Sequence, residues 1–208
     1  MSQKRSPSAK TSIRRAEAIF RQHGGMMRTQ EARQAGIHPR TLYALRDAGV
    51  LDRLSRGVYR LAAAMPLGNP DLVTVAIRAP ESVICLISAL AFHELTTQIP
   101  HEVYVAVPRG AEPPRLDHPP IRTFWFIGKV FVEGIETHRL DGVDVRIYSR
   151  EKTLIDCFKY RNKIGMDTVL EAIRLYKQSR RTNVDVLMRY ADVCRVSRVI
   201  RPYLEAML

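Results

Sequence analysis

The stretch from Thr29 to Tyr59 constrains the fold of this chain more than any other part. Thr29 is placed to cap a short helix over residues 30–35, because a threonine hydroxyl accepts a free backbone N–H of the first turn. Gly36 ends that helix, since glycine adopts the left-handed conformation without a steric penalty. Pro39 suits the first position of a second helix, where its missing N–H is not needed. The pattern predicts a helix-turn-helix.

The residues that follow predict a wing beside the two helices. Leu42 and Leu45 lie three residues apart on one face of the second helix and should face a core. Two short apolar runs, residues 50–51 and 58–61, surround a Ser/Gly turn and predict a β-hairpin, with Arg56 at its tip. The two helices alone would fit an ordinary small helical domain. The hairpin and its arginines favour a winged helix, whose second helix enters the major groove of DNA.

Several basic and polar side chains of this region are suited to DNA. Arginine can pair with a guanine edge, which gives sequence selectivity, or with a phosphate, which strengthens binding to any sequence. The predicted DNA-binding set comes from both helices and the wing: Arg28, Gln30, Arg40, Thr41, Arg46, Arg56 and Arg60.

The charge of the chain is concentrated in the same segment. Residues 1–70 hold 13 Lys and Arg against 4 Asp and Glu, whereas residues 71–208 hold 20 against 17. A positive field over the helix-turn-helix is expected of a surface that neutralises phosphates. A basic excess that served only solubility would not explain this asymmetry.

A division into two domains is expected from composition and hydrophobic pattern. Residues 1–11 read as a flexible basic tail, residues 12–64 as the winged helix-turn-helix domain and residues 65–68 as a linker of small residues. Residues 69–208 can bury a core of their own. Within the first domain, Ser12 is predicted to cap a helix over residues 13–22.

The second domain is predicted to hold strands in the middle and helices at both ends, which is an α+β arrangement with a small, mainly antiparallel sheet. Asp141-Gly142 between two alternating runs is the strongest hairpin signal in the chain. The expected helices cover 71–78, 150–160, 166–178, 184–190 and 193–207, and the expected strands cover 103–107, 121–127, 135–140 and 143–148.

The sequence contains no signal for export, for a membrane span or for a disulfide framework. Cys85, Cys157 and Cys194 are far apart in apolar surroundings, which indicates buried thiols rather than zinc ligands. The N-terminus is polar and basic, unlike a secretory signal. The longest apolar run, residues 83–92, is too short to cross a bilayer. A cytoplasmic protein without membrane partners is expected.

No catalytic motif is present, and we expect no catalytic residues, metal or cofactor. The chain has no nucleophile elbow, no phosphate-binding loop and no zinc-protease motif. His93-Glu94 and His101-Glu102 are the isolated candidates, and His93 is interpreted as a structural residue. Asp156, in an apolar run, should be buried in an ion pair, with an arginine of the last helices as one possible partner. An enzyme is the least favoured class. A ligand-sensing repressor with a pocket near Phe124 and Trp125 remains an alternative.

Two sets of motifs resemble a known family over nearly the whole chain from about residue 12. Residues 33–43 read Arg-Gln-Ala-Gly-Ile-His-Pro-Arg-Thr-Leu-Tyr, and residues 54–61 read Leu-Ser-Arg-Gly-Val-Tyr-Arg-Leu. The second set of motifs comes from the second domain, at residues 84–90, 93–98 and 149–158. Together they resemble the AbiEi-type antitoxins of bacterial type IV toxin–antitoxin systems.

The resemblance implies a function for each domain. The winged helix would bind double-stranded DNA at the protein's own promoter, on inverted repeats, and repress transcription. The second domain would counteract a nucleotidyltransferase-like toxin encoded beside it. Basic side chains around two turns of the second domain are candidates for contact with that partner: Lys159, Arg161, Lys163, Arg180 and Arg181. A solvated helix edge would explain any one of them equally well.

Overall fold

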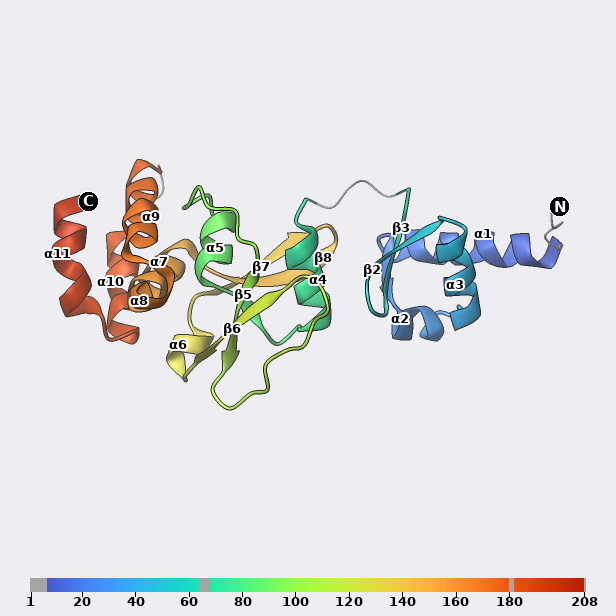
Figure 1. Cartoon of the computed structure of the whole chain (residues 1–208), viewed down its shortest axis with the longest axis horizontal. Helices are drawn as coiled ribbons and strands as arrows, with labels where there is room; N and C mark the ends of the chain where they lie inside the picture. The colour runs from blue at the N-terminus through green and yellow to red at the C-terminus, as the bar shows by residue number, and fades with distance from the viewer. Residues whose placement is uncertain (1–6, 64–67, 180–181, 208) are drawn as a thin grey trace. The chain divides into compact units, whose positions relative to one another are not determined.

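The computed structural model describes residues 7–63, 68–179 and 182–207. The chain divides into two compact units, residues 1–68 and 69–208. Each unit has its own elements and its own core, and each is described separately below (Figure 1). Residues 1–6 of the predicted tail and residues 65–67 of the predicted linker lie outside the described residues, as do Arg180 and Arg181.

The first unit combines helices with a small antiparallel sheet. Its sheet is three-stranded, in the order β1-β3-β2, so that β3 lies in the middle. The strands β2 and β3 form the predicted wing, with Arg56 and Gly57 at the turn between them. The elements in chain order are α1 (Pro7–Gln22), β1 (Met26–Arg28), α2 (Thr29–Gln34), α3 (Pro39–Asp47), β2 (Leu51–Ser55) and β3 (Val58–Leu61).

The predicted core of this unit is confirmed. Leu42 and Leu45 are buried and pack in one cluster with Phe20 of α1 and Leu51 of β2. The first helix differs from its prediction, because it begins at Pro7 rather than at residue 13. Residues 7–11 are therefore helical and not a flexible tail.

The second unit is built around a five-stranded sheet in the order β6-β5-β4-β8-β7. The α+β class is confirmed, but this sheet is mixed rather than mainly antiparallel, because β5 pairs with β6, and β4 with β8, in parallel. Its elements are α4 (Pro70–Arg78), β4 (Val83–Ile84), α5 (Leu86–Phe92), β5 (Val103–Pro108), β6 (Ile121–Phe126), α6 (Lys129–Val132), β7 (Ile135–Leu140), β8 (Val143–Tyr148), α7 (Arg150–Lys159), α8 (Arg161–Ile164), α9 (Met166–Gln178), α10 (Val184–Val193) and α11 (Ser197–Met207).

Alternation along the strands places two apolar layers on the sheet. Val103 and Val105 of β5 pack in one cluster with Leu72 of α4. Tyr104 and Ala106, the alternate residues, belong to a larger cluster with α5, α7 and the C-terminal helices. The helices therefore cover both faces of the sheet, as their arrangement in Figure 1 also shows. The predicted hairpin is confirmed, since Leu140 pairs with Val143 across Asp141-Gly142.

Asp156 and His93, two polar residues of the second unit that stand out in the sequence, each have a partner. Asp156 is fully buried in an ion pair, but its partner is Lys152, one turn earlier in α7, and not an arginine of the last helices. The Cys194 thiol donates a further hydrogen bond to the Asp156 carboxylate, at 3.4 Å. His93 is held by the Tyr148 carbonyl, 2.7 Å from its Nε2, which agrees with a structural histidine.

The expected buried thiols are confirmed, since Cys85, Cys157 and Cys194 are free and buried. Burial raises the pKa of Cys85 and Cys157 well above the ordinary value and that of Cys194 to about 12. Trp125 is 46% exposed and its indole N–H donates to the Ala111 carbonyl, while Phe124 is buried against Tyr104 and Tyr160, so the two residues do not line a common pocket. Among the described helices, none is long and apolar enough to cross a membrane.

Candidate nucleic-acid interface

The turn between α2 and α3 is fixed by backbone hydrogen bonds at a glycine. Gly36 has a φ of +82°, and its N–H donates to the Arg33 carbonyl at 3.0 Å. The Ile37 N–H donates to the Ala32 carbonyl at 2.8 Å, which completes the paired bonds of a Schellman motif. Ile37 is itself buried, so the turn is anchored to the core as well as to the helix. This arrangement sets the direction in which α3 leaves the turn.

The N-terminus of α3 is capped by a histidine. His38 is the N-cap residue, and its Nδ1 accepts a hydrogen bond from the Arg40 backbone N–H at 3.2 Å. Pro39 occupies the first helical turn, as predicted. His38 is exposed, so this cap lies at the end of α3 that a helix-turn-helix directs toward DNA.

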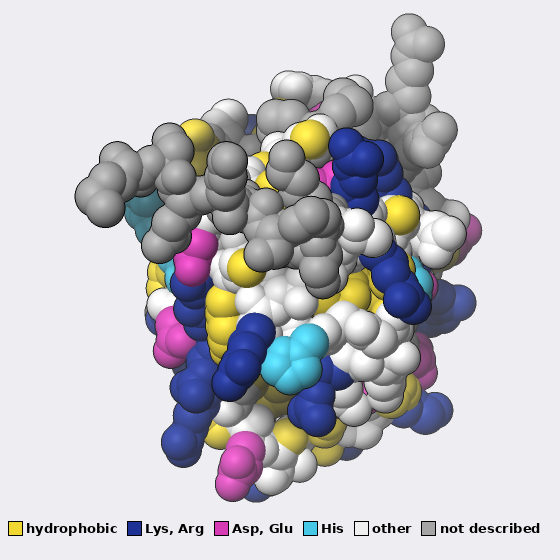
Figure 2. All heavy atoms as spheres, turned by 90° about the vertical axis from the view of Figure 1, so that its right-hand side faces the viewer, with side chains coloured by type: hydrophobic (Ala, Val, Ile, Leu, Met, Phe, Trp, Pro, Cys, Tyr) yellow, Lys and Arg dark blue, Asp and Glu magenta, His cyan; other side chains and the backbone are white. Residues whose placement is uncertain are grey.

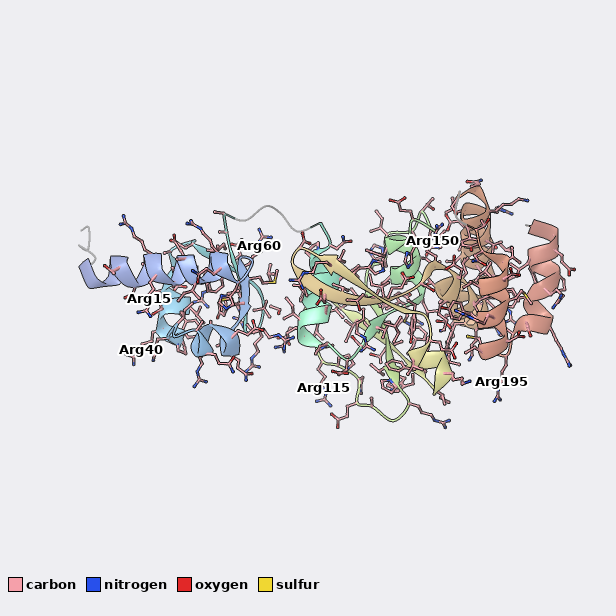
Figure 3. The ribbon with its side chains drawn as sticks, turned by 180° about the vertical axis from the view of Figure 1, so that it is seen from behind. Arg15, Arg40, Arg60, Arg115, Arg150 and Arg195 are labelled. Carbon is pink, nitrogen blue, oxygen red and sulfur yellow. The ribbon has the colours of Figure 1, made fainter. Side chains whose placement is uncertain are left out.

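The solvent face of α3 lies opposite the buried leucines. Arg40, Tyr43, Ala44 and Asp47 are exposed and recur at helical spacing. Tyr43 is 49% exposed, which is unusual for so large an apolar ring. Arg40 is labelled on this helix in Figure 3. The face combines a free cation with an aromatic ring and a small side chain, a combination suited to base edges and thymine methyl groups.

The Arg46 side chain is less available for contact with DNA than that of Arg40. Its guanidinium donates from Nε and Nη2 to the Asp47 carboxylate, at 2.9 and 2.7 Å. It also lies over the Tyr43 ring, 5.4 Å from the centroid. Because Asp47 neutralises part of its charge, Arg46 would have to exchange this partner to bind a phosphate.

The wing is tied to the start of α2 by Thr29. The Thr29 hydroxyl and backbone N–H both donate to the Gly57 carbonyl, at 3.2 and 2.8 Å. Thr29 therefore anchors the wing and does not cap α2; the N-cap residue is Arg28, whose N–H donates to Glu31. The anchored turn holds the exposed Arg56 next to Gly57, at the tip of the wing.

The remaining predicted residues differ in accessibility. Gln30 is exposed in the first turn of α2, whereas Arg28 and Thr41 are half-buried. Arg60 is not exposed as expected, because only 9% of it is accessible and its Nε donates to the Leu61 carbonyl at 3.4 Å. It lies in the middle strand of the sheet, between Met26 and Asp52 of its neighbours, where its side chain packs on the unit itself. We leave Arg60 out of the interface.

Two exposed residues of the α3 surface were left out of the predicted DNA-binding set. His38 and Tyr43 are exposed beside Arg40, yet neither was among the predicted contacts. Tyr43 follows Arg40 by three residues, so helical spacing could have identified it. The cap at His38 could not have been found by the usual preference for Ser, Thr, Asp and Asn.

The surface around these elements is basic. Figure 2, which faces the side of α1 and α3 in the first unit, shows Lys and Arg side chains distributed over this face with few acidic ones. Such a field attracts polyanions before any specific contact forms.

Three of the predicted partner contacts of the second unit, Lys159, Arg161 and Lys163, lie at the end of α7 and in α8. Lys159 is exposed in the last turn of α7. Arg161 donates from Nη1 to the Phe158 carbonyl at 3.0 Å, and the Lys163 ammonium lies 5.7 Å from the Tyr160 ring. Arg161 is therefore partly engaged within the unit. Within residues 7–63, 68–179 and 182–207, no group of three or more His, Cys, Asp or Glu could hold a metal ion.

Comparison with known proteins supports the resemblance noted from the sequence. Residues 14–62 match the family described as "Transcriptional regulator, AbiEi antitoxin". This match covers α1 from Arg14 through the last wing strand and confirms the resemblance there. A search of curated protein sequences gives no match.

A solved structure resembles the chain more broadly. The crystal structure of the RV2827C protein from Mycobacterium tuberculosis has a TM-score of 0.62 and 13% sequence identity, over 90% of this chain and 72% of that one. At this identity the likeness concerns the fold alone.

Proposed function

We propose that this protein is a DNA-binding transcriptional autorepressor and an antitoxin that counteracts a nucleotidyltransferase-like toxin. The family match over residues 14–62 supports the coarser statement, an antitoxin-type regulator. The operator, the partner and the division of labour between the two units are our inference.

The observation that carries the proposal is the solvent face of α3. It presents Arg40 and Tyr43 away from Leu42 and Leu45, and the wing is fixed beside α2 by Thr29. The proposed contacts are Arg40 and Thr41 from α3, Gln30 and Arg28 near the start of α2, and Arg56 from the wing. Arg46 joins them by exchanging Asp47 for a phosphate. Since the helix reads bases and the wing holds backbone, Arg40 would provide selectivity and Arg56 affinity.

The proposed operator is an inverted repeat in the protein's own promoter. A winged helix reads only a few base pairs, so two copies bound to two half-sites would supply the selectivity that one copy lacks. Autorepression follows if the repeat overlaps the start of transcription.

The antitoxic activity is assigned to the second unit. It spans residues 69–208 and has a core separate from that of the first unit. In this proposal it opposes the toxin without contacting the promoter. The basic residues Lys159, Arg161 and Lys163 are its candidate partner contacts, with Arg180 and Arg181 added from the sequence alone.

The two activities can be separated by co-expression with the adjacent toxin. Residues 69–208, expressed from an unrelated promoter, should rescue growth, whereas residues 1–66 should not. The full chain carrying Arg40→Ala and Arg56→Ala should also rescue growth under that promoter while losing repression. Rescue by residues 1–66 alone would show that repression is the whole mechanism and would contradict the role given to the second unit.

A further inference from the structure

A groove of the second unit is lined by basic side chains from separate elements. It has a volume of about 430 Å³, which is the size of pockets that hold small ligands. Lys129 of α6, Lys159 of α7 and Arg195, just after α10, all line it, and no Asp or Glu is among its described lining residues. Figure 3 labels Arg195 at the end of α10, close to α6.

No hydrogen bond or ion pair engages the side chains of these cations among the described residues of their own unit. By contrast, Arg122 and Arg139 pair with carboxylates. Three like charges around one hollow repel each other and raise its positive potential. A multivalent anion in the groove would remove that repulsion.

The backbone at Arg195 adds an independent argument. The Arg195 N–H donates to the Asp192 carbonyl, and the Val196 N–H donates to the Ala191 carbonyl, so α10 ends in a Schellman motif. Arg195 occupies its left-handed position, with a φ of +59°, where the same motif in α2 has Gly36. A side chain with a Cβ is strained there, and strain of this kind is concentrated at binding and functional sites.

The groove also has an apolar component. Ile127, Val130 and Val193 also line it. Free phosphate would leave these side chains unused, whereas a phosphorylated molecule with a flat apolar part would contact both. Arginine and lysine are the usual phosphate ligands, and arginine can bind two phosphate oxygens at once.

We propose that this groove binds a small phosphorylated molecule of nucleotide size, with its phosphates on Lys129, Lys159 and Arg195 and its ring against the apolar wall. The site belongs to the second unit and does not depend on DNA binding, although Lys159 is also a candidate contact for the toxin. The protein would then bind a small molecule in addition to DNA.

The test is titration of the full chain with ATP, pyrophosphate and adenosine by calorimetry. All samples carry Arg40→Ala and Arg56→Ala, so that the proposed DNA interface attracts less phosphate. ATP should bind more tightly than pyrophosphate, and adenosine most weakly, because only ATP uses both the cations and the apolar wall. Lys159→Gln and Arg195→Gly should each weaken ATP binding by about tenfold, the loss of one charge-assisted contact.

Arg195→Gly separates binding from folding. Glycine relieves the left-handed strain, so this variant should be at least as stable as the parent protein while it binds ATP less tightly. Arg174→Gln, an exposed charge removed from α9 of the same unit, serves as the matched control and should leave affinity within about twofold.

Three results would overturn the proposal. The first is no heat of binding for ATP or pyrophosphate at about 1 mM, the weak end of specific affinity. The second is ATP binding that neither substitution weakens. The third is binding of a poly-glutamate peptide without binding of ATP, which would identify the groove as a docking surface for an acidic protein segment.

Discussion

Lys152 and Asp156 form an ion pair in which both side chains are 0% exposed. The Lys152 ammonium also lies 4.3 Å from the centroid of the Tyr148 ring and 5.1 Å from that of Phe126. Burial raises the pKa of the Asp156 carboxyl, and the Lys152 charge opposes this shift by favouring the carboxylate. The pair is satisfied only as long as both partners remain.

Removal of one partner should therefore be costly. Asp156→Ala should lower the free energy of unfolding by about 3–5 kcal/mol, because it leaves the Lys152 charge buried without a partner. The double variant Lys152→Met, Asp156→Leu removes both charges and should recover most of that loss. Urea denaturation measures the unfolding free energies of the single and the double variant. A double variant as unstable as the single one would show that packing, and not the unpaired charge, is responsible.

Close packing at Gly134 gives a second prediction. A Cβ added there would lie 2.7 Å from Lys152 Cβ and 3.2 Å from Tyr190 Cζ, and Gly134 has a φ of +78°. Gly142 has a similar φ of +81° but no described atom within 4 Å of the added carbon. Gly142→Ala should cost about 1–2 kcal/mol for the left-handed backbone alone. Gly134→Ala should cost about 1–3 kcal/mol more, from overpacking. Thermal denaturation measures the two variants. An equal drop in melting temperature for Gly134→Ala and Gly142→Ala would contradict the overpacking at Gly134.

His93 makes stability depend on pH. Burial lowers the pKa of His93, while its bond to the Tyr148 carbonyl acts in the opposite direction. Because the folded state binds this proton less readily than the unfolded state, the contribution of His93 is present above about pH 6.5 and is lost as pH falls below it. Between pH 7 and 5.5 the wild-type protein should lose more unfolding free energy than His93→Gln. If the unfolding free energies of the two proteins fall in parallel with pH, His93 is not the cause of the pH dependence.

The sequence predicted those parts of the fold whose signals are local. Gly36 and Pro39 place a turn between two helices, and Asp141-Gly142 places a hairpin, because each acts through its own backbone preferences. The parallel pairs β5–β6 and β4–β8 join distant segments, so no local pattern reveals them. The mixed sheet could therefore not be predicted.

Exposure of the candidate site residues was predicted where a local pattern determines it, and not where the position in the sheet does. Arg40 was expected on the solvent face because Leu42 and Leu45 fix the opposite face of the helix, and it is exposed there. Arg60 was expected to be exposed because of its charge, whereas the central position of β3 buries it. Lys152 was missed as the partner of Asp156, since a lysine in a helix is usually solvated.

Salt dependence tests the electrostatic part of the proposed function. A single winged helix with about 4–6 phosphate contacts should show a log–log slope of affinity against salt of roughly −4 to −5. Fluorescence anisotropy with a fragment that holds one half-site of the promoter measures it. Arg56→Ala should reduce the slope by about one if Arg56 binds a phosphate. A slope near zero would mean that the basic surface does not face DNA.

Binding of the protein to its own promoter tests the central claim most directly. Gel-shift affinities are compared for the wild-type protein, Arg40→Ala, Arg56→Ala and the control Arg21→Ala, which removes an exposed charge of α1 paired with Glu17. Arg40→Ala should weaken specific binding by roughly 1–3 kcal/mol and reduce the preference over unrelated DNA. Arg56→Ala should weaken binding to the promoter and binding to unrelated DNA by the same factor. Arg21→Ala should change either affinity little. Unchanged affinity in both Arg40→Ala and Arg56→Ala would contradict the assignment of α3 and the wing as the DNA-binding surface.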